Sequence, residues 1–283
     1  LDPKVPVSVS SLIKGTTIQS ANDAAITLAE AIGNGSIDEF VKQMNEEAKR
    51  LGMKHTHFNN PTGISSNGHV STVGDLAILA SALINDYPKY YPLFANKSFK
   101  YNNIEQPNRN LLLYRDSSID GLKTGYSEGA GYHLAASSKR NNRRIVSILA
   151  GAESTEARAS ESSKLLNWAL QAFDTPKLYN GGEVISQVKV YKGSTKAADI
   201  GFLDDVYITI PHDTGKNVKP ILETLQPVLA PIEKGQVLGK LKVMKDGKII
   251  AEKDVVALTG VEEGSWLRRM WDAIVLWFKG LFS

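Results

Sequence analysis

The sequence predicts an α+β fold: an antiparallel sheet with flanking helices, followed by a small all-β domain and a C-terminal amphipathic helix. Several segments with helical periodicity lie between residues 10 and 83, alternating strand-like runs begin near Phe99, and helical periodicity returns after the β-rich part only at 266–283. With 283 residues, 42% of them hydrophobic, the chain can bury more than one core. We therefore divide it into residues 1–176, 177–262 and 263–283.

The first predicted helix is expected to begin at a cap on Ser10 or Ser11 and to break near Ser20. It resumes as an Ala-rich helix that ends at Gly33 and Gly35. Ser20 is thus predicted to lie at a junction between two helices.

Further helices and strands are predicted to complete this domain. A helix at 38–51 and one that begins after Thr72 both carry apolar residues at helical spacing, which indicates core-facing surfaces; in the second helix these include Leu76, Leu79 and Leu83. The remaining predicted elements are strands at 132–138 and 143–152, joined by a polar turn at 139–142, and a helix at 157–173 before Pro176.

Residues 177–262 show only strand patterns. Alternating runs occupy 183–191, 205–211 and 236–258, and Lys245-Asp246-Gly247-Lys248 has the composition of a hairpin turn. Without helices, this segment cannot belong to the mixed domain before it. We predict a small β domain with a structural role as a spacer.

Composition excludes several classes of function. The 33 basic and 30 acidic residues are spread along the chain, so the net charge of +3 gives no nucleic-acid surface. No cysteine is present, which excludes disulfides, thiolate metal sites and a thiol nucleophile. Residues 1–10 lack the pattern of a secretory signal, so any export segment is expected to be already removed or to lie outside the chain.

The C-terminal segment has the pattern of an in-plane membrane anchor. On a helical wheel, its polar half holds Arg268, Arg269, Asp272 and Lys279, and these charges argue against a helix that spans the bilayer. The alternative is a helix docked on its own protein; three tryptophans and the terminal position favour the membrane surface. The apolar half consists of Trp266, Leu267, Met270, Trp271, Ile274, Val275, Trp277, Phe278, Leu281 and Phe282.

Two short motifs carry the predicted chemistry, Ser20-Ala21-Asn22 and Lys123-Thr124-Gly125. A lysine supplies a point cation for a carboxylate, a threonine adds a hydroxyl donor, and a glycine in a strand lets a substrate approach the backbone. Each triplet alone is common at caps and turns. Together they match two of the three signatures of serine acyl-transferases that recognise penicillin, and we expect them to converge on one cleft.

The surrounding sequence resembles the low-molecular-mass D-alanyl-D-alanine carboxypeptidases of the penicillin-binding protein 5 and 6 type over essentially the whole chain. The matching segments are IQSANDAAITLAE, THFNNPTG, HVSTVGDLA, QPNRNLLL, IDGLKTG, AGYHLAASS, ESSKLLNWALQAF and VYITIP. The resemblance implies a transpeptidase/β-lactamase-like first domain. It also implies a periplasmic enzyme that is held on the outer face of the bacterial inner membrane by its terminal helix.

The same resemblance implies roles for individual residues. Ser20 and Asn22 would supply a hydroxyl for proton transfer and an amide for the substrate backbone, while Lys123, Thr124 and Gly125 would bind the substrate carboxylate. Arg158 stands where close relatives carry an arginine that helps to hold this carboxylate; a surface arginine that begins a helix is the alternative. The implied partners are peptidoglycan pentapeptides that end in D-Ala-D-Ala and β-lactam antibiotics, with no cofactor.

The family's attacking serine belongs to a Ser-x-x-Lys motif that precedes Ser-x-Asn by several tens of residues. Ser11 and Lys14 satisfy this pattern, but only nine positions separate Ser11 from Ser20. We therefore expect Ser11 to be a cap or first-turn serine. The nucleophile is expected to lie in a longer parent protein, ahead of the first residue of this chain.

Two other functions, and the possibility of a metal site, are alternatives to a carboxypeptidase. A serine β-lactamase would share the motifs, but the β domain and membrane helix disfavour it. A non-catalytic peptidoglycan-binding module could describe the fragment alone; covalent labelling of the parent by penicillin separates the enzyme from such a module, and the rate of nitrocefin turnover separates it from a β-lactamase. The five histidines give no metal-ligand spacing and are predicted to be structural; they are His55, His57, His69, His133 and His212.

Overall fold

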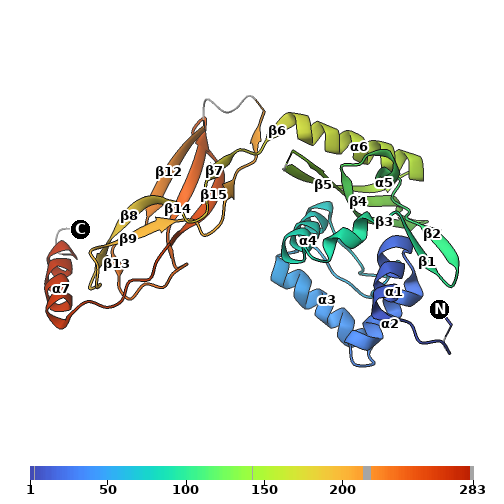
Figure 1. Cartoon of the computed structure of the whole chain (residues 1–283), viewed down its shortest axis with the longest axis horizontal. Helices are drawn as coiled ribbons and strands as arrows, with labels where there is room; N and C mark the ends of the chain where they lie inside the picture. Colours follow the sequence, from blue (N-terminus) through green and yellow to red (C-terminus); the bar gives the residue numbers. More distant parts are fainter. Residues whose placement is uncertain (3, 142, 213–217, 281–283) are drawn as a thin grey trace. The chain divides into compact units, whose positions relative to one another are not determined.

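The computed structural model describes residues 1–2, 4–141, 143–212 and 218–280, and the chain forms two compact units, Leu1–Leu170 and Gln171–Ser283 (Figure 1). The division falls six residues before the predicted one. The short strand β6, Phe173–Asp174, explains this position, because it pairs with β11, Ile210–Pro211, inside the second unit.

The first unit is a three-stranded antiparallel sheet with helices on both faces. Its sheet has the order β3-β4-β5, so β3 lies at an edge. The elements are α1 (Val9–Lys14), the π-helical turn η1 (Gly15–Gln19), α2 (Asn22–Ile32), α3 (Ile37–Leu51), α4 (Val73–Asp86), the 3₁₀ turn η2 (Tyr91–Ala95), β1 (Ser98–Tyr101), β2 (Ile104–Pro107), α5 (Leu112–Arg115), β3 (Ile119–Ser127), β4 (Gly131–Arg140), β5 (Arg143–Ala152) and α6 (Thr155–Ala172).

Local sequence explains where these helices begin. Ser36 and Thr72 cap α3 and α4 by accepting hydrogen bonds from Glu39 N and Asp75 N. The cap of α1 is Ser8, which accepts from Ser11 N, so the predicted cap at Ser10 or Ser11 is wrong by two or three residues. Ser11 itself lies in the first turn of α1. This agrees with the expectation that Ser11 is a cap or first-turn serine.

Alternation along β4 separates the two faces of the sheet. Leu134 and Ala136 are buried in one cluster with Leu166 of α6, whereas the neighbouring Ala135 packs on a second cluster that contains Ala80 of α4. Figure 1 shows α6 and α4 on opposite sides of this sheet. One predicted core residue of α4, Leu79, is instead 36% exposed.

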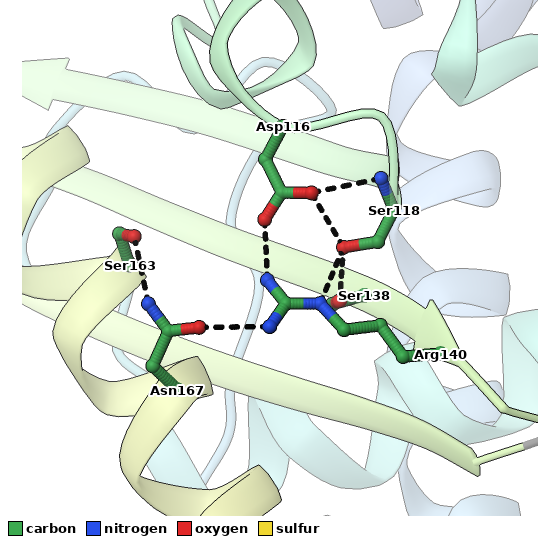
Figure 2. Close-up of polar contacts among 6 residues, drawn as sticks. All are labelled: Asp116, Ser118, Ser138, Arg140, Ser163 and Asn167. Carbon is green, nitrogen blue, oxygen red and sulfur yellow. Dashed lines mark hydrogen bonds and ion pairs between the residues drawn. The ribbon is translucent and has the colours of Figure 1, made fainter.

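A polar network joins α6 to the end of β4 (Figure 2). The Arg140 guanidinium at the end of β4 donates to Ser118 Oγ at 2.9 Å, to Asn167 Oδ1 of α6 at 2.9 Å, and to the Asp116 carboxylate. Ser118 Oγ also lies 2.8 Å from Ser138 Oγ. The Arg140 guanidinium is bonded to three side chains, so we interpret this network as a structural feature and not as a ligand site.

The second unit is built on a six-stranded sheet of order β12-β14-β15-β9-β8-β13, in which only β13 runs parallel to its partner, β8. The predicted hairpin turn is confirmed: Asp246 and Gly247 connect β14 to β15 with positive φ values of 48° and 76°. The elements are β6, β7 (Lys177–Tyr179), β8 (Val184–Tyr191), β9 (Ala197–Gly201), β10 (Val206–Tyr207), β11, β12 (Val218–Thr224), β13 (Val228–Leu229), β14 (Val237–Lys245), β15 (Lys248–Ala257) and α7 (Trp266–Gly280).

Helix α7 is docked on the second unit by its polar residues. The Arg268 guanidinium donates to the carbonyl oxygens of Ser194 and Thr195, and the Asp272 carboxylate accepts from Lys192 N at 2.6 Å. No helix in the described part of the chain combines the length and apolar character needed to cross a bilayer.

Candidate active site

The Ser20–Asn22 motif lies at a helix junction, as the sequence predicted. Helix α1 passes into the π-helical turn η1, and Ser20 ends this turn in the left-handed conformation with φ 63° and ψ 39°. Asn22 then begins α2. A left-handed non-glycine residue next to a π-helical turn is uncommon, and both features concentrate at functional sites.

Strand β3 brings Lys123 to this junction. The Lys123 amine donates to Ser20 Oγ at 2.7 Å and to the carbonyl oxygen of Thr124 at 2.7 Å. Residues 103 positions apart in the sequence are therefore in direct contact. The structure brings together one residue from each of the two predicted motifs.

Two arginines surround this contact. Arg158 of α6 is only 4% exposed, and its guanidinium donates to the carbonyl oxygen of Arg109 at 3.0 Å and reaches that of Gly125 at 3.5 Å. Arg109 in turn donates through Nε to Gln19 Oε1 at 3.2 Å. Arg158 is thus buried, so the alternative of a surface arginine is wrong.

The three cations leave positive charge uncompensated. Among the described residues, no carboxylate forms an ion pair with Lys123, Arg109 or Arg158. The pKa of the Lys123 amine is lowered to about 8, first by burial and then by the positive charges of Arg109 and Arg158. Since buried cations are normally paired, this arrangement has the charge required to bind an anion.

The other predicted site residues lie around this centre. Thr124 is buried, and Gly125 faces His133 on β4, where an added Cβ would stand 3.5 Å from the imidazole. Asn22 is exposed in the first turn of α2, and in the described parts of the chain no hydrogen bond joins its side chain to Ser20 or Lys123. Because β3 is an edge strand, its free side can accept an extended peptide.

Sequence reasoning missed two residues that hold the site together. Arg109 lies within a segment used for the resemblance, but its bond to Gln19 depends on a tertiary contact. Asn110 is fully buried and donates to the carbonyl oxygen of Gly121 at the start of β3. The only pattern in the sequence that could have indicated these two residues is a polar Asn-Arg-Asn segment directly before an apolar Leu-Leu-Leu segment.

In the described residues, no group of three or more histidine, aspartate or glutamate side chains lies close enough together to hold a metal ion. His133 Nδ1 accepts from Gly151 N at 3.1 Å, and His69 Nδ1 accepts from Asn59 N at 3.0 Å. Both imidazoles therefore support local backbone structure.

Comparisons with known proteins show the family of the chain. The family model described as D-alanyl-D-alanine carboxypeptidase matches residues 1–154, and the penicillin-binding protein 5 C-terminal domain matches residues 173–263. The carboxypeptidase DacA of Haemophilus influenzae is 39% identical over 100% of this chain and 72% of its own length. DacC of Escherichia coli is 38% identical, also over 100% of this chain and 72% of its own length.

Solved structures of penicillin-binding proteins also match this chain. Penicillin-binding protein 5 from Haemophilus influenzae superposes with a TM-score of 0.84 at 38% identity, over 93% of this chain and 77% of that one. An ampicillin-bound penicillin-binding protein D2 from Listeria monocytogenes matches with a TM-score of 0.53 at 34% identity, over 57% of this chain and 66% of its own. With its two matching domains and its contact between Ser20 and Lys123, the chain belongs to the D-alanyl-D-alanine carboxypeptidase family of the penicillin-binding protein 5 type.

Proposed function

We propose that this chain carries the substrate-binding and proton-transfer part of a serine D-alanyl-D-alanine carboxypeptidase. Its substrate is a peptidoglycan peptide that ends in D-Ala-D-Ala, and β-lactams acylate the same serine. The observation that carries the proposal is the Lys123 amine, which donates to Ser20 Oγ at 2.7 Å, lies beside two arginines and pairs with no carboxylate of the described residues. The ampicillin-bound relative supports the β-lactam part.

The reaction proceeds through an acyl-enzyme. A serine oxygen attacks the carbonyl carbon of the penultimate D-alanine, the peptide C–N bond breaks, and the serine proton ends on the amine of the departing D-alanine. Water then hydrolyses the ester. Lys123, with Thr124 and Arg158, holds the terminal carboxylate.

Ser20 serves as the proton route in this scheme. Because the Lys123 ammonium donates to Ser20 Oγ, the Ser20 hydroxyl hydrogen can point away from Lys123 toward the leaving amine. A lysine with a pKa of about 8 can also exchange this proton near neutral pH. Asn22, which is exposed at the start of α2, would bond the substrate backbone.

Two assays on the full-length protein test this function. Incubation with an N-acylated peptide ending in D-Ala-D-Ala should release free D-alanine, and fluorescent penicillin should label the protein covalently. Mass spectrometry then locates the acylated serine. Rapid turnover of nitrocefin without D-alanine release would instead establish a β-lactamase, and binding of the peptide with neither reaction would establish a non-catalytic module.

The pH dependence of ligand binding follows from the lowered pKa of Lys123. Below pH 8 the amine is charged and attracts the ligand carboxylate; above pH 8 it loses its proton and this attraction disappears. We expect the Kd for a carboxylate ligand to rise up to about tenfold per pH unit above 8. Titrations between pH 6.5 and 9.5 check this, and affinity that stays constant to pH 9.5 would contradict it.

We also propose that α7 lies on the periplasmic surface of the inner membrane. This is supported by its direction of docking: Arg268 and Asp272 face the β unit, while Trp271 and Trp277 are 66% and 64% exposed. Such a surface fits the headgroup boundary of a bilayer. The exposed apolar residues are Trp266, Leu267, Met270, Trp271, Ile274, Trp277 and Phe278; the predicted Leu281 lies outside the described residues.

Vesicle binding tests the role of these tryptophans. Replacing Trp271 and Trp277 together by alanine removes two indoles from the lipid boundary and is expected to weaken partitioning into vesicles by about 100-fold. Trp168→Ala is the matched control, because Trp168 is 57% exposed on α6 of the other unit. Equal binding by the double variant and the control would count against the anchor.

A further inference from the structure

Beside the docked helix, the second unit contains a cavity that the proposed carboxypeptidase reaction does not use. Its volume is about 470 Å³, and it lies where the first turns of α7 meet the end of β13 and the turn after β8. We call it the α7 cavity. It is lined by Lys192, Leu229, Ala230, Glu263, Trp266, Arg269 and Met270.

Lys192 gives the cavity its charge. Within the described part of the chain, no carboxylate lies within ion-pair distance of the Lys192 amine, whereas Arg269 is paired with Glu263. The backbone of Lys192 is fixed on both sides: its N–H donates to Asp272, and its carbonyl accepts from Gly264 N at 2.8 Å. The backbone that carries this side chain is thus held by hydrogen bonds to Asp272 and Gly264 in the cavity wall.

The apolar side of the cavity continues into the exposed face of α7. Trp266 and Met270 line the cavity and are 66% and 46% exposed, and Leu229 adds a third apolar side chain, 43% exposed. A ligand that fits needs an anionic group for Lys192 and an attached apolar part for these side chains. Both are present in a phospholipid whose headgroup carries a net negative charge.

We propose that the α7 cavity binds the phosphate headgroup of an anionic phospholipid. The inference rests on the proposed membrane association of α7 and adds a specific lipid site to it. The phosphate oxygens accept from the Lys192 amine and from the Arg269 N–H groups that Glu263 leaves unused. The acyl chains extend from the cavity along Trp266 and Met270 into the bilayer.

The test compares Lys192→Gln with Lys196→Gln. Glutamine removes one charge in each case and leaves a polar side chain that is one methylene shorter, and Lys196 is exposed and close in sequence but does not line the cavity. Binding is measured on phosphatidylcholine vesicles with and without 30% phosphatidylglycerol. We expect Lys192→Gln to weaken binding to the anionic vesicles about fivefold, with Lys196→Gln within twofold of the unaltered protein.

The other outcomes separate the inference from the membrane proposal. Equal losses for both variants would show a diffuse surface charge and overturn the site. If the unaltered protein binds both vesicles equally, the site fails while the anchor stands; if it binds neither, the anchor fails as well.

A second measurement distinguishes lipid from free phosphate. In the ¹⁵N-labelled protein, the amide signals of Gly193 and Gly264 should shift with short-chain dihexanoyl phosphatidylglycerol. Inorganic phosphate at the same concentration should leave them unchanged. Equal shifts with both ligands would assign the cavity to free phosphate and overturn the lipid assignment.

Discussion

Replacing Lys123 by glutamine is expected to lower kcat/KM for D-alanine release by about 1,000-fold, because the substitution removes two contributions at once. The charge-assisted bond to the substrate carboxylate accounts for about ten- to 100-fold, and the proton route through Ser20 for at least a further tenfold. Glutamine keeps a donor near Ser20 Oγ, so the helix junction should stay folded. Steady-state kinetics of D-alanine release measure the effect.

Two variants show whether the loss comes from this site. Lys139→Gln removes an exposed lysine from β4 of the same sheet and should leave kcat/KM within twofold. Lys123→Arg keeps the charge but cannot place a single compact donor between Ser20 and Thr124. Recovery of most activity by Lys123→Arg would mean that charge alone is needed, and near-normal activity of Lys123→Gln would remove Lys123 from the mechanism.

Asn110→Asp should have the largest effect on stability among the residues that support the site. Asn110 is 0% exposed; its Oδ1 accepts from Leu112 N at 3.1 Å and its Nδ2 donates to the carbonyl oxygen of Gly121 at 3.1 Å. Aspartate keeps the acceptor but turns the donor into a second, charged acceptor that faces Gly121. We expect a loss of about 3 kcal/mol in the free energy of unfolding at pH 8.

The pH dependence of this variant identifies the cause. Burial raises the pKa of a carboxyl at position 110, so the protonated form, which can donate to Gly121, is the stable one in the folded state. Stability relative to the unaltered protein should therefore improve as the pH falls from 8 to 5. Urea denaturation measures it, with Asn85→Asp on the exposed face of α4 as a control. A loss below 1 kcal/mol at pH 8 would contradict the expected role of Asn110.

Local patterns were enough to predict most of the fold. Thr72 and the apolar residues after it gave the start of α4, and Asp246-Gly247 gave the hairpin between β14 and β15. The cap of α1 was missed because three serines, including Ser8, compete at the same turn. The parallel pairing of β13 with β8 was beyond prediction, since the pairing of distant strands depends on tertiary packing.

The site was predicted only in part for the same reason. The residue types of both motifs indicated the chemistry, but the left-handed Ser20 follows from a π-helical turn that no local pattern signals. The bond from Arg109 to Gln19 joins segments 90 residues apart. A helical wheel likewise gave the two faces of α7, but only the structure shows that Arg268 and Asp272 are on the docked side.

The attachment of α7 also bears on how this protein can vary during evolution. Arg268 and Asp272 bond to main-chain atoms of residues 192, 194 and 195, which every amino acid except proline at 192 supplies. The side chains of residues 194 and 195 can therefore change without detaching the helix, whereas the arginine and aspartate themselves are constrained. Orthologues should accordingly keep this pair, four positions apart, while residues 194 and 195 vary.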